Sequence, residues 1–261
     1  MVAVRRRPPQ NMTAFECLLR GIYHHRLGGV TDDNVHEAIK WFDKAISADP
    51  NYAAAYAWRV CAAAWFSDMD IDRAERDIRH ALELDPCDPE ANRIMGSVEL
   101  LKEDFEAAAA HSLKAIELNP SDAYIKARVA GILTFLGDAK RALALLDQAE
   151  TLDPLLPVWC IEERGVALYA LERYTDTLEA LTKLTFQTYR SRLYRAAALI
   201  ALERQQGAKK LVKEALANNP RLTICGFMFN ERYRDLAKQR ELRWRLKQAG
   251  LPEQPSSAQQ E

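Results

Sequence analysis

Five prolines recur along this chain at nearly even spacing, and each is followed by a new helical pattern: Pro50, Pro86, Pro120, Pro154 and Pro220. The intervals between them are 36, 34, 34 and 66 residues, so the last is close to two units of about 34 with one marker missing. A period of this length is typical of helical hairpins stacked into a solenoid. The spacing therefore predicts one elongated array of about six hairpins.

Small residues fall into register when the segments are aligned on these prolines. Alanine stands twelve residues and again five residues before each proline, at Ala38, Ala74, Ala108, Ala142 and Ala208, and at Ala45, Ala81, Ala115, Ala149 and Ala215. Helices that pack closely need small residues where they cross. Eight residues before each proline stand Phe42, Ile78, Ser112, Leu146 and Val212. We expect the four large members of this last set to fill the space between neighbouring hairpins.

Composition excludes further classes of fold and of binding partner. The 261 residues include 36 basic and 37 acidic side chains, so a net charge of −1 gives no global attraction to nucleic acid or anionic membranes. Ten glycines and no alternating β-branched run favour an all-helical fold. The five cysteines form no CxxC pair, which predicts reduced thiols packed as small apolar residues. Without a secretory signal or a long apolar stretch, we expect a soluble, cytoplasmic protein.

The chain divides into four parts by pattern. Residues 1–10 read as a basic linker, 11–220 as the repeat array, 221–252 as a capping segment and helix, and 253–261 as a disordered polar tail. The first repeat carries an insertion at Gly28–Gly29, and the fifth has lost its closing proline and has Thr177 where alanine is expected. In the predicted capping helix, apolar side chains gather near one face: Leu236, Leu242, Leu246 and Ala249.

The third unit, "PEANRIMGSVELLKEDFEAAAAHSLKAIELNP", resembles the tetratricopeptide repeat (TPR). Its small, aromatic, small, small and proline positions are occupied by Gly96, Phe105, Ala108, Ala115 and Pro120. The resemblance implies an all-α, right-handed superhelix of helical hairpins with a C-terminal capping helix. It also implies a protein or peptide as the partner, bound on the first helices of the repeats.

Two boundary segments are similar to something more specific. "RRRPPQNMTAFECLLRGIYHH" and "NERYRDLAKQRELRWRLKQAGLPE" resemble the two ends of the C-terminal TPR region of bacterial class III adenylate or guanylate cyclases. The sequence lacks the catalytic domain of that family and has Glu231–Arg232 where the family often has proline. The resemblance implies a regulatory or scaffolding region that contacts a catalytic domain. Alternatives are a free-standing TPR adaptor or the sensor arm of a bacterial winged-helix regulator.

No pattern that carries catalysis is present. The sequence lacks GxSxG, GxxxxGK[ST], HExxH and GxGxxG, and its histidines have no ligand spacing. Asp68, Asp70 and Asp72 resemble the start of a calcium loop, but Arg73 occupies the glycine position. We therefore expect no enzyme, no cofactor, no metal and no catalytic residue. The basic run from Tyr189 to Arg195 is interpreted as a solvated helix face rather than a nucleic-acid site.

Repeat phase predicts which side chains line a partner-binding groove: Ala57, Cys61, Trp65, Arg93, Ser97, Tyr124 and Arg128. Because Ala57, Cys61 and Glu90 stand where some TPR proteins hold a terminal carboxylate with basic groups, such a clamp is disfavoured. A small, apolar groove suits an amphipathic helix or an extended segment. We expect the double substitution Trp65→Ala with Arg93→Glu to weaken partner binding without unfolding the array. Alternatively the groove is ordinary lining, or is filled by the terminus of the chain itself.

Overall fold

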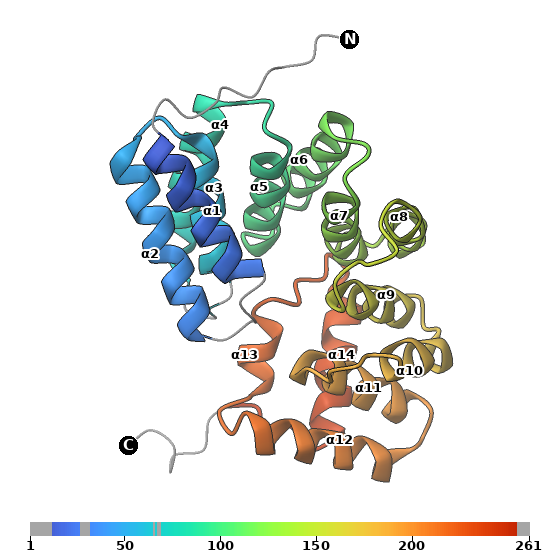
Figure 1. Cartoon of the computed structure of the whole chain (residues 1–261). Coiled ribbons are helices and arrows are strands. Elements are labelled where there is room, and N and C mark those ends of the chain that lie inside the picture. The colour runs from blue at the N-terminus through green and yellow to red at the C-terminus, as the bar shows by residue number, and fades with distance from the viewer. Residues whose placement is uncertain (1–11, 27–31, 65, 67–68, 255–261) are drawn as a thin grey trace. The chain divides into compact units, whose positions relative to one another are not determined.

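The computed structural model describes residues 12–26, 32–64, 66 and 69–254 (Figure 1). The predictions for residues 1–10, for Gly28–Gly29, for Trp65 and for all but the start of the tail lie outside these ranges. The described residues form fourteen helices and no strand: α1 (Met12–Arg26), α2 (Asp32–Ala48), α3 (Ala53–Ala63), α4 (Ile71–Leu84), α5 (Pro89–Leu101), α6 (Phe105–Leu118), α7 (Ala123–Phe135), α8 (Ala139–Leu152), α9 (Trp159–Ala170), α10 (Tyr174–Thr182), α11 (Tyr189–Ala201), α12 (Gln205–Asn218), α13 (Ile224–Met228) and α14 (Leu236–Gln248). The expectation of an all-α solenoid of helical hairpins is confirmed.

The helices pair into successive hairpins within two compact units. The first unit, Met1–Pro120, contains the hairpins α1–α2, α3–α4 and α5–α6. The second, Ser121–Glu261, contains α7–α8, α9–α10 and α11–α12, followed by α13 and α14. Within each unit the first helices of neighbouring hairpins also contact one another. Sequence periodicity predicts one array over residues 11–220 and does not mark this division.

The positions predicted for helix crossings are buried. Each of the ten alanines in the two registers is at most 4% exposed, and the large residues between them are at most 2% exposed. Close approach also explains two glycines on first helices. A Cβ at Gly96 would lie 2.5 Å from the Ser112 hydroxyl, and one at Gly165 would lie 2.3 Å from Leu181. Leu181 thus packs on the first-helix glycine of the fifth hairpin as Ser112 does in the third, although no proline marks the end of the fifth repeat.

A second periodic feature lies in the turns inside the hairpins. In four hairpins the second residue after the first helix adopts a left-handed backbone: Glu103 (φ 63°), Gly137 (94°), Glu172 (62°) and Glu203 (60°). The amide after each of these residues donates to a carbonyl five positions earlier, as Arg204 does to Leu199 at 2.8 Å. This pattern is the Schellman ending of a helix, which satisfies its last carbonyl groups. The fifth hairpin therefore has the same turn as its neighbours.

Helix starts follow from aspartates placed just before them. Asp70, Asp88, Asp104, Asp122 and Asp138 each accept a hydrogen bond from the backbone amide three residues later. Such N-caps satisfy amides that the first helical turn leaves without a partner. The carboxylate of Asp70, considered above as part of a calcium-like loop, serves as the cap of α4.

The end of the second unit packs back on the array. Helix α14 contacts α11, and Leu242, Leu246 and Ala249 are at most 1% exposed. Leu236, the fourth apolar residue of the predicted face, is 57% exposed because it lies at the start of the helix, outside the buried stripe. After α14 the chain returns to α13, where the Ile224 amide donates to the Pro252 carbonyl at 2.8 Å.

Candidate functional site

In the first unit the structure brings together two residues of the predicted groove. The guanidinium of Arg93 on α5 donates from Nη2 to the sulfur of Cys61 on α3 at 3.3 Å. Ser97, one turn along α5, donates its hydroxyl to the Arg93 carbonyl at 3.4 Å. Ala57 is 1% exposed and belongs to the hydrophobic core between α3, α4 and α5. Of the predicted groove residues in this unit, Cys61 and Arg93 thus form a polar pair, and Ala57 lies in the core.

Arg93 is more deeply buried than its predicted role as a groove-edge cation suggests. It is 3% exposed, and its guanidinium donates to both carboxylate oxygens of Glu90, at 2.9 Å and 3.0 Å. The predicted Arg93→Glu substitution would place two carboxylates side by side in this buried position. It would therefore measure a loss of folding stability rather than a loss of partner binding.

The other two predicted residues lie in the second unit, at the start of α7. The Tyr124 hydroxyl lies 3.4 Å from Nε of Arg128, and the Arg128 guanidinium stacks over the ring of Trp159 at 3.9 Å. The rings of Tyr124 and Trp159 meet edge to face at 5.2 Å. All three side chains are partly exposed. Repeat phase did not place Trp159 among the groove residues, because this residue opens α9 after the irregular segment that precedes the fifth repeat.

A short segment of the chain itself covers part of this unit. The first helices α7, α9 and α11 form a surface here called the first-helix face of the second unit. Residues 229–235, which connect α13 to α14 without helical structure, lie against it. The carboxylate of Glu231 accepts hydrogen bonds from Nε of Arg190 at 2.7 Å and from the Tyr194 hydroxyl at 2.5 Å. Because Glu231 is only 2% exposed, its carboxylate interacts with side chains of this face rather than with solvent.

Tyr233 and Arg234 extend the contact toward α7. The Tyr233 ring meets Phe135 edge to face at 4.9 Å, and its hydroxyl lies 2.9 Å from that of Tyr194. The Arg234 amide donates to the Phe135 carbonyl at 2.9 Å. The segment is thus bound by an ion pair, an aromatic contact and a main-chain hydrogen bond. These are the interactions with which a binding surface holds an extended peptide.

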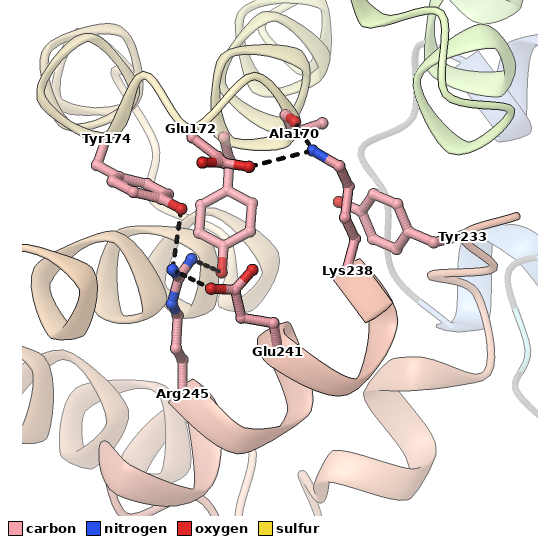
Figure 2. Close-up of a pocket in the computed structure, with 8 residues that line it drawn as sticks. Ala170, Glu172, Tyr174, Tyr233, Lys238, Glu241 and Arg245 are labelled. Atoms are coloured by element: carbon pink, nitrogen blue, oxygen red, sulfur yellow. Dashed lines mark hydrogen bonds and ion pairs between the residues drawn. The ribbon is translucent and has the colours of Figure 1, made fainter. Parts of the chain in front are cut away.

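Helix α14 also contacts the turn between α9 and α10 and the helix residues beside it (Figure 2). Arg245 donates to the hydroxyls of Tyr169 and Tyr174, each at 2.9 Å, and to Glu241 at 2.6 Å. Lys238 reaches the Ala170 carbonyl and lies 3.7 Å from Glu172. The small pocket between these side chains is therefore lined by groups that already bind one another.

Three carboxylates surround the buried guanidinium of Arg190. It contacts Glu231 and Glu163, with Glu162 at 3.9 Å. Burial alone would lower the pKa of Arg190, but Glu163 and then Glu231 raise it well above its ordinary value. Burial raises the pKa of Glu162 above the ordinary carboxyl value, since Arg190 and the Thr188 hydroxyl offset only part of the desolvation. Arg190, Glu162, Glu163 and Glu231 thus form one network of charged and titratable groups, to which the 229–235 segment contributes Glu231.

The interpretation of residues 189–195 as a solvated helix face is wrong for four of them. Ser191, Leu193 and Tyr194 are fully buried, and the side chain of Arg190 is only 18% exposed. Glu231 of the 229–235 segment contacts both Arg190 and Tyr194. The partners Arg190 and Glu231 are 41 residues apart, and no repeat relates them. The one sequence signal was Glu231–Arg232, the departure from the resembling family.

The described residues contain no group of three or more His, Cys, Asp or Glu side chains placed to hold a metal ion. Nor is any helix in the described ranges both long enough and apolar enough to cross a bilayer. The cysteines, all within those ranges, are free thiols. Cys17 and Cys160 are buried as predicted, whereas Cys225 is exposed.

Solved structures share this fold at low sequence identity. A tetratricopeptide repeat protein from Parabacteroides merdae has a TM-score of 0.59 and 14% identity, covering 94% of this chain and 87% of its own. PilW, a type IV pilus biogenesis factor, has a TM-score of 0.59 and 17% identity, covering 80% and 95%. A chain of the APC/C hetero-tetramer Cut9–Hcn1 has a TM-score of 0.65 and 18% identity, covering 88% and 44%, so this chain spans less than half of it. The chain has the TPR fold.

No protein-family model and no curated protein sequence matches the chain.

Proposed function

We propose that this chain is a protein–protein interaction module that binds an extended segment of a partner on its first helices. The observation that carries the proposal is the 229–235 segment, which the first-helix face of the second unit holds through Glu231, Tyr233 and the Arg234 amide. A surface that binds one extended segment in this way has the chemistry to bind another.

The part of that face at the N-terminal ends of α7 and α9 is the binding surface we assign to the partner. Tyr124, Arg128 and Trp159 lie there, partly exposed, with the guanidinium stacked on the indole. Aromatic and arginine side chains contribute most of the binding free energy in many interfaces. Arg128 suits a carboxylate and Trp159 an apolar side chain, so the partner segment is expected to be acidic and apolar. In the first unit, Cys61 and Ser97 remain proposed contact residues.

The biological setting we favour is a regulatory or scaffolding role. It rests on the resemblance of residues 5–25 and 230–253 to the ends of the TPR region of bacterial cyclases. The partner would then be a catalytic domain or another signalling protein. Coding sequence upstream of Met1 discriminates among the settings: a cyclase domain favours this one, a winged helix favours the sensor arm, and neither favours an adaptor.

A random peptide library displayed against the immobilised full chain tests the binding function. We expect enriched peptides with an acidic residue near an apolar one, whose Kd rises at least tenfold for Arg128→Glu and for Trp159→Ala. Tenfold corresponds to about 1.4 kcal/mol, a typical loss for one central interface residue.

Trp244→Ala is the matched control, because Trp244 is 57% exposed and lies on α14, a helix that supplies none of the assigned residues. Peptides that bind wild type and all three variants equally would show that the surface is assigned wrongly. A library that yields no binder would refute the function itself.

A further inference from the structure

Three helices of the first unit bring their side chains together at one thiol. Cys61, on α3, lies 3.3 Å from Nη2 of Arg93 on α5 and 3.5 Å from Nε2 of His25 on α1. Cys61 is a partly exposed residue, whereas Arg93 is 3% exposed. A cation and an imidazole thus flank the sulfur atom of a residue that is not fully enclosed in the core. This combination distinguishes a nucleophilic thiol from a packing thiol.

Both neighbours of the sulfur are fixed in place. Glu90 accepts two hydrogen bonds from Arg93, which orients the guanidinium toward Cys61. The His25 ring packs edge to face on Trp58, with ring centroids 5.9 Å apart. The charged and titratable groups that act on the sulfur are therefore Arg93 and His25, which favour the thiolate, and Glu90, which opposes it.

Three of the other four cysteines provide the contrast within the same chain. Cys17 belongs to the hydrophobic core of the first unit. Cys160 is 6% exposed, and burial raises its pKa to about 12. Cys225 is exposed and has Arg243 at 3.3 Å, but the Glu253 carboxylate lies 4.0 Å from its sulfur. Cys61 combines a buried cation with an imidazole at its sulfur.

We infer that Cys61 is a nucleophilic thiol site that reacts with peroxides and small electrophiles. With hydrogen peroxide, the Cys61 thiolate attacks one oxygen, so an S–O bond forms as the O–O bond breaks. The sulfur loses two electrons and becomes a sulfenic acid, and the peroxide is reduced to hydroxide, which takes a proton from His25 or the solvent to give water. The reactivity of this thiol does not depend on the partner-binding surface assigned to Tyr124, Arg128 and Trp159.

The protonation state of the thiol agrees with this geometry. Burial alone would raise the pKa of Cys61, but Arg93 and His25 lower it from 9.0 to about 6. At pH 6 about half of such a thiol is ionised, against about 0.3% of an ordinary cysteine of pKa about 8.5. A thiolate of lower pKa is intrinsically less nucleophilic, which reduces the expected rate advantage at pH 6 to about tenfold.

The test is the alkylation of the folded full chain by iodoacetamide between pH 5 and 9, with each cysteine followed by peptide mass spectrometry. We expect the rate at Cys61 to reach half its maximum near pH 6, while Cys160 stays unlabelled. Peroxide at pH 6 should give a sulfenic acid at Cys61, trapped by dimedone. A half-maximal rate at pH 8.5 or above, or labelling of Cys61 only after unfolding, overturns the inference.

Two variants that each remove one charge are expected to shift the profile in opposite directions. Arg93→Gln removes the cation and should move the midpoint of the Cys61 profile toward higher pH. Glu90→Gln removes the opposing carboxylate and should move it toward lower pH, although both changes disturb the same ion pair. Shifts in the same direction would show that the charges do not act on Cys61. The wild-type profile decides the matter even if a variant fails to fold.

Discussion

The carboxylate of Glu231 is buried against Arg190 and Tyr194, which come from a helix far from it in sequence. Removing one member of a buried ion pair leaves the other charge poorly compensated and costs about 3–5 kcal/mol. Here Glu163 still contacts Arg190 at 3.0 Å, so we expect Glu231→Ala to lower the free energy of unfolding by about 3 kcal/mol. Urea denaturation at pH 7 measures this change.

Glu172→Ala is the control for this prediction. Its carboxylate is 66% exposed and forms a single surface ion pair with Lys238, which is worth less than about 1 kcal/mol. Equal losses for the two variants would mean that the 229–235 segment contributes little to the stability of the second unit.

At the scale of residues, periodicity predicted burial better than it predicted contacts. The alanine registers at helix crossings follow directly from the 34-residue period, and all ten are buried. Repeat phase also placed Cys61 and Arg93 on first helices. It could not show that Arg93 is covered, nor that Arg190 pairs with Glu231, since phase gives the direction of a side chain and not what lies above it. Contacts outside the repeat have no periodic signal.

At the scale of elements, the turns inside the hairpins contain a residue with a strained, left-handed backbone, and substitution of that residue by glycine would remove the strain. A residue with a side chain costs roughly 1–2 kcal/mol in the left-handed conformation, whereas glycine adopts it readily. Glu203 has φ 60° and is exposed. We expect Glu203→Gly to raise the free energy of unfolding by about 1 kcal/mol, measured by thermal or urea denaturation.

Lys209→Gly, at an exposed position inside α12, should do the opposite and cost about 1 kcal/mol, because glycine is unfavourable in a helix interior. If both substitutions destabilise, the left-handed turn is not strained.

These turns also show why the fifth hairpin was hard to recognise. The array was identified from its prolines, and this repeat has none at its end. Its turn residue, Glu172, stands 35 residues after Gly137, but glutamate is not a residue that indicates a left-handed conformation. The capping helix was predicted from its apolar stripe, which the structure places on α11 except for Leu236.

At the scale of the whole molecule, the division into two units predicts two regions that lose structure separately. In repeat arrays each hairpin interacts mainly with its neighbours, so a local loss of stability stays local. Leu246 is fully buried on α14, and Leu246→Ala should cost about 2–5 kcal/mol. We expect faster amide hydrogen exchange in α9–α14 and unchanged exchange in α1–α6.

Trp244→Ala, on the exposed side of the same helix, should leave exchange unchanged in both units. Faster exchange throughout the chain in Leu246→Ala would show that the two units unfold together. The sequence could not predict this division, because the same period continues on both sides of Pro120.

The covalent attachment of the 229–235 segment sets a threshold for any outside ligand of the same surface. A tethered ligand acts at an effective concentration on the order of millimolar. If the empty face bound such a segment with a Kd of about 1 μM, a free peptide of equal affinity would bind with an apparent Kd about a thousand times weaker, near 1 mM. Ordinary cellular peptides cannot compete at that level. The second unit therefore selects against peptides that resemble its own segment, and the partner is proposed to bind instead at Tyr124, Arg128 and Trp159, which are partly exposed.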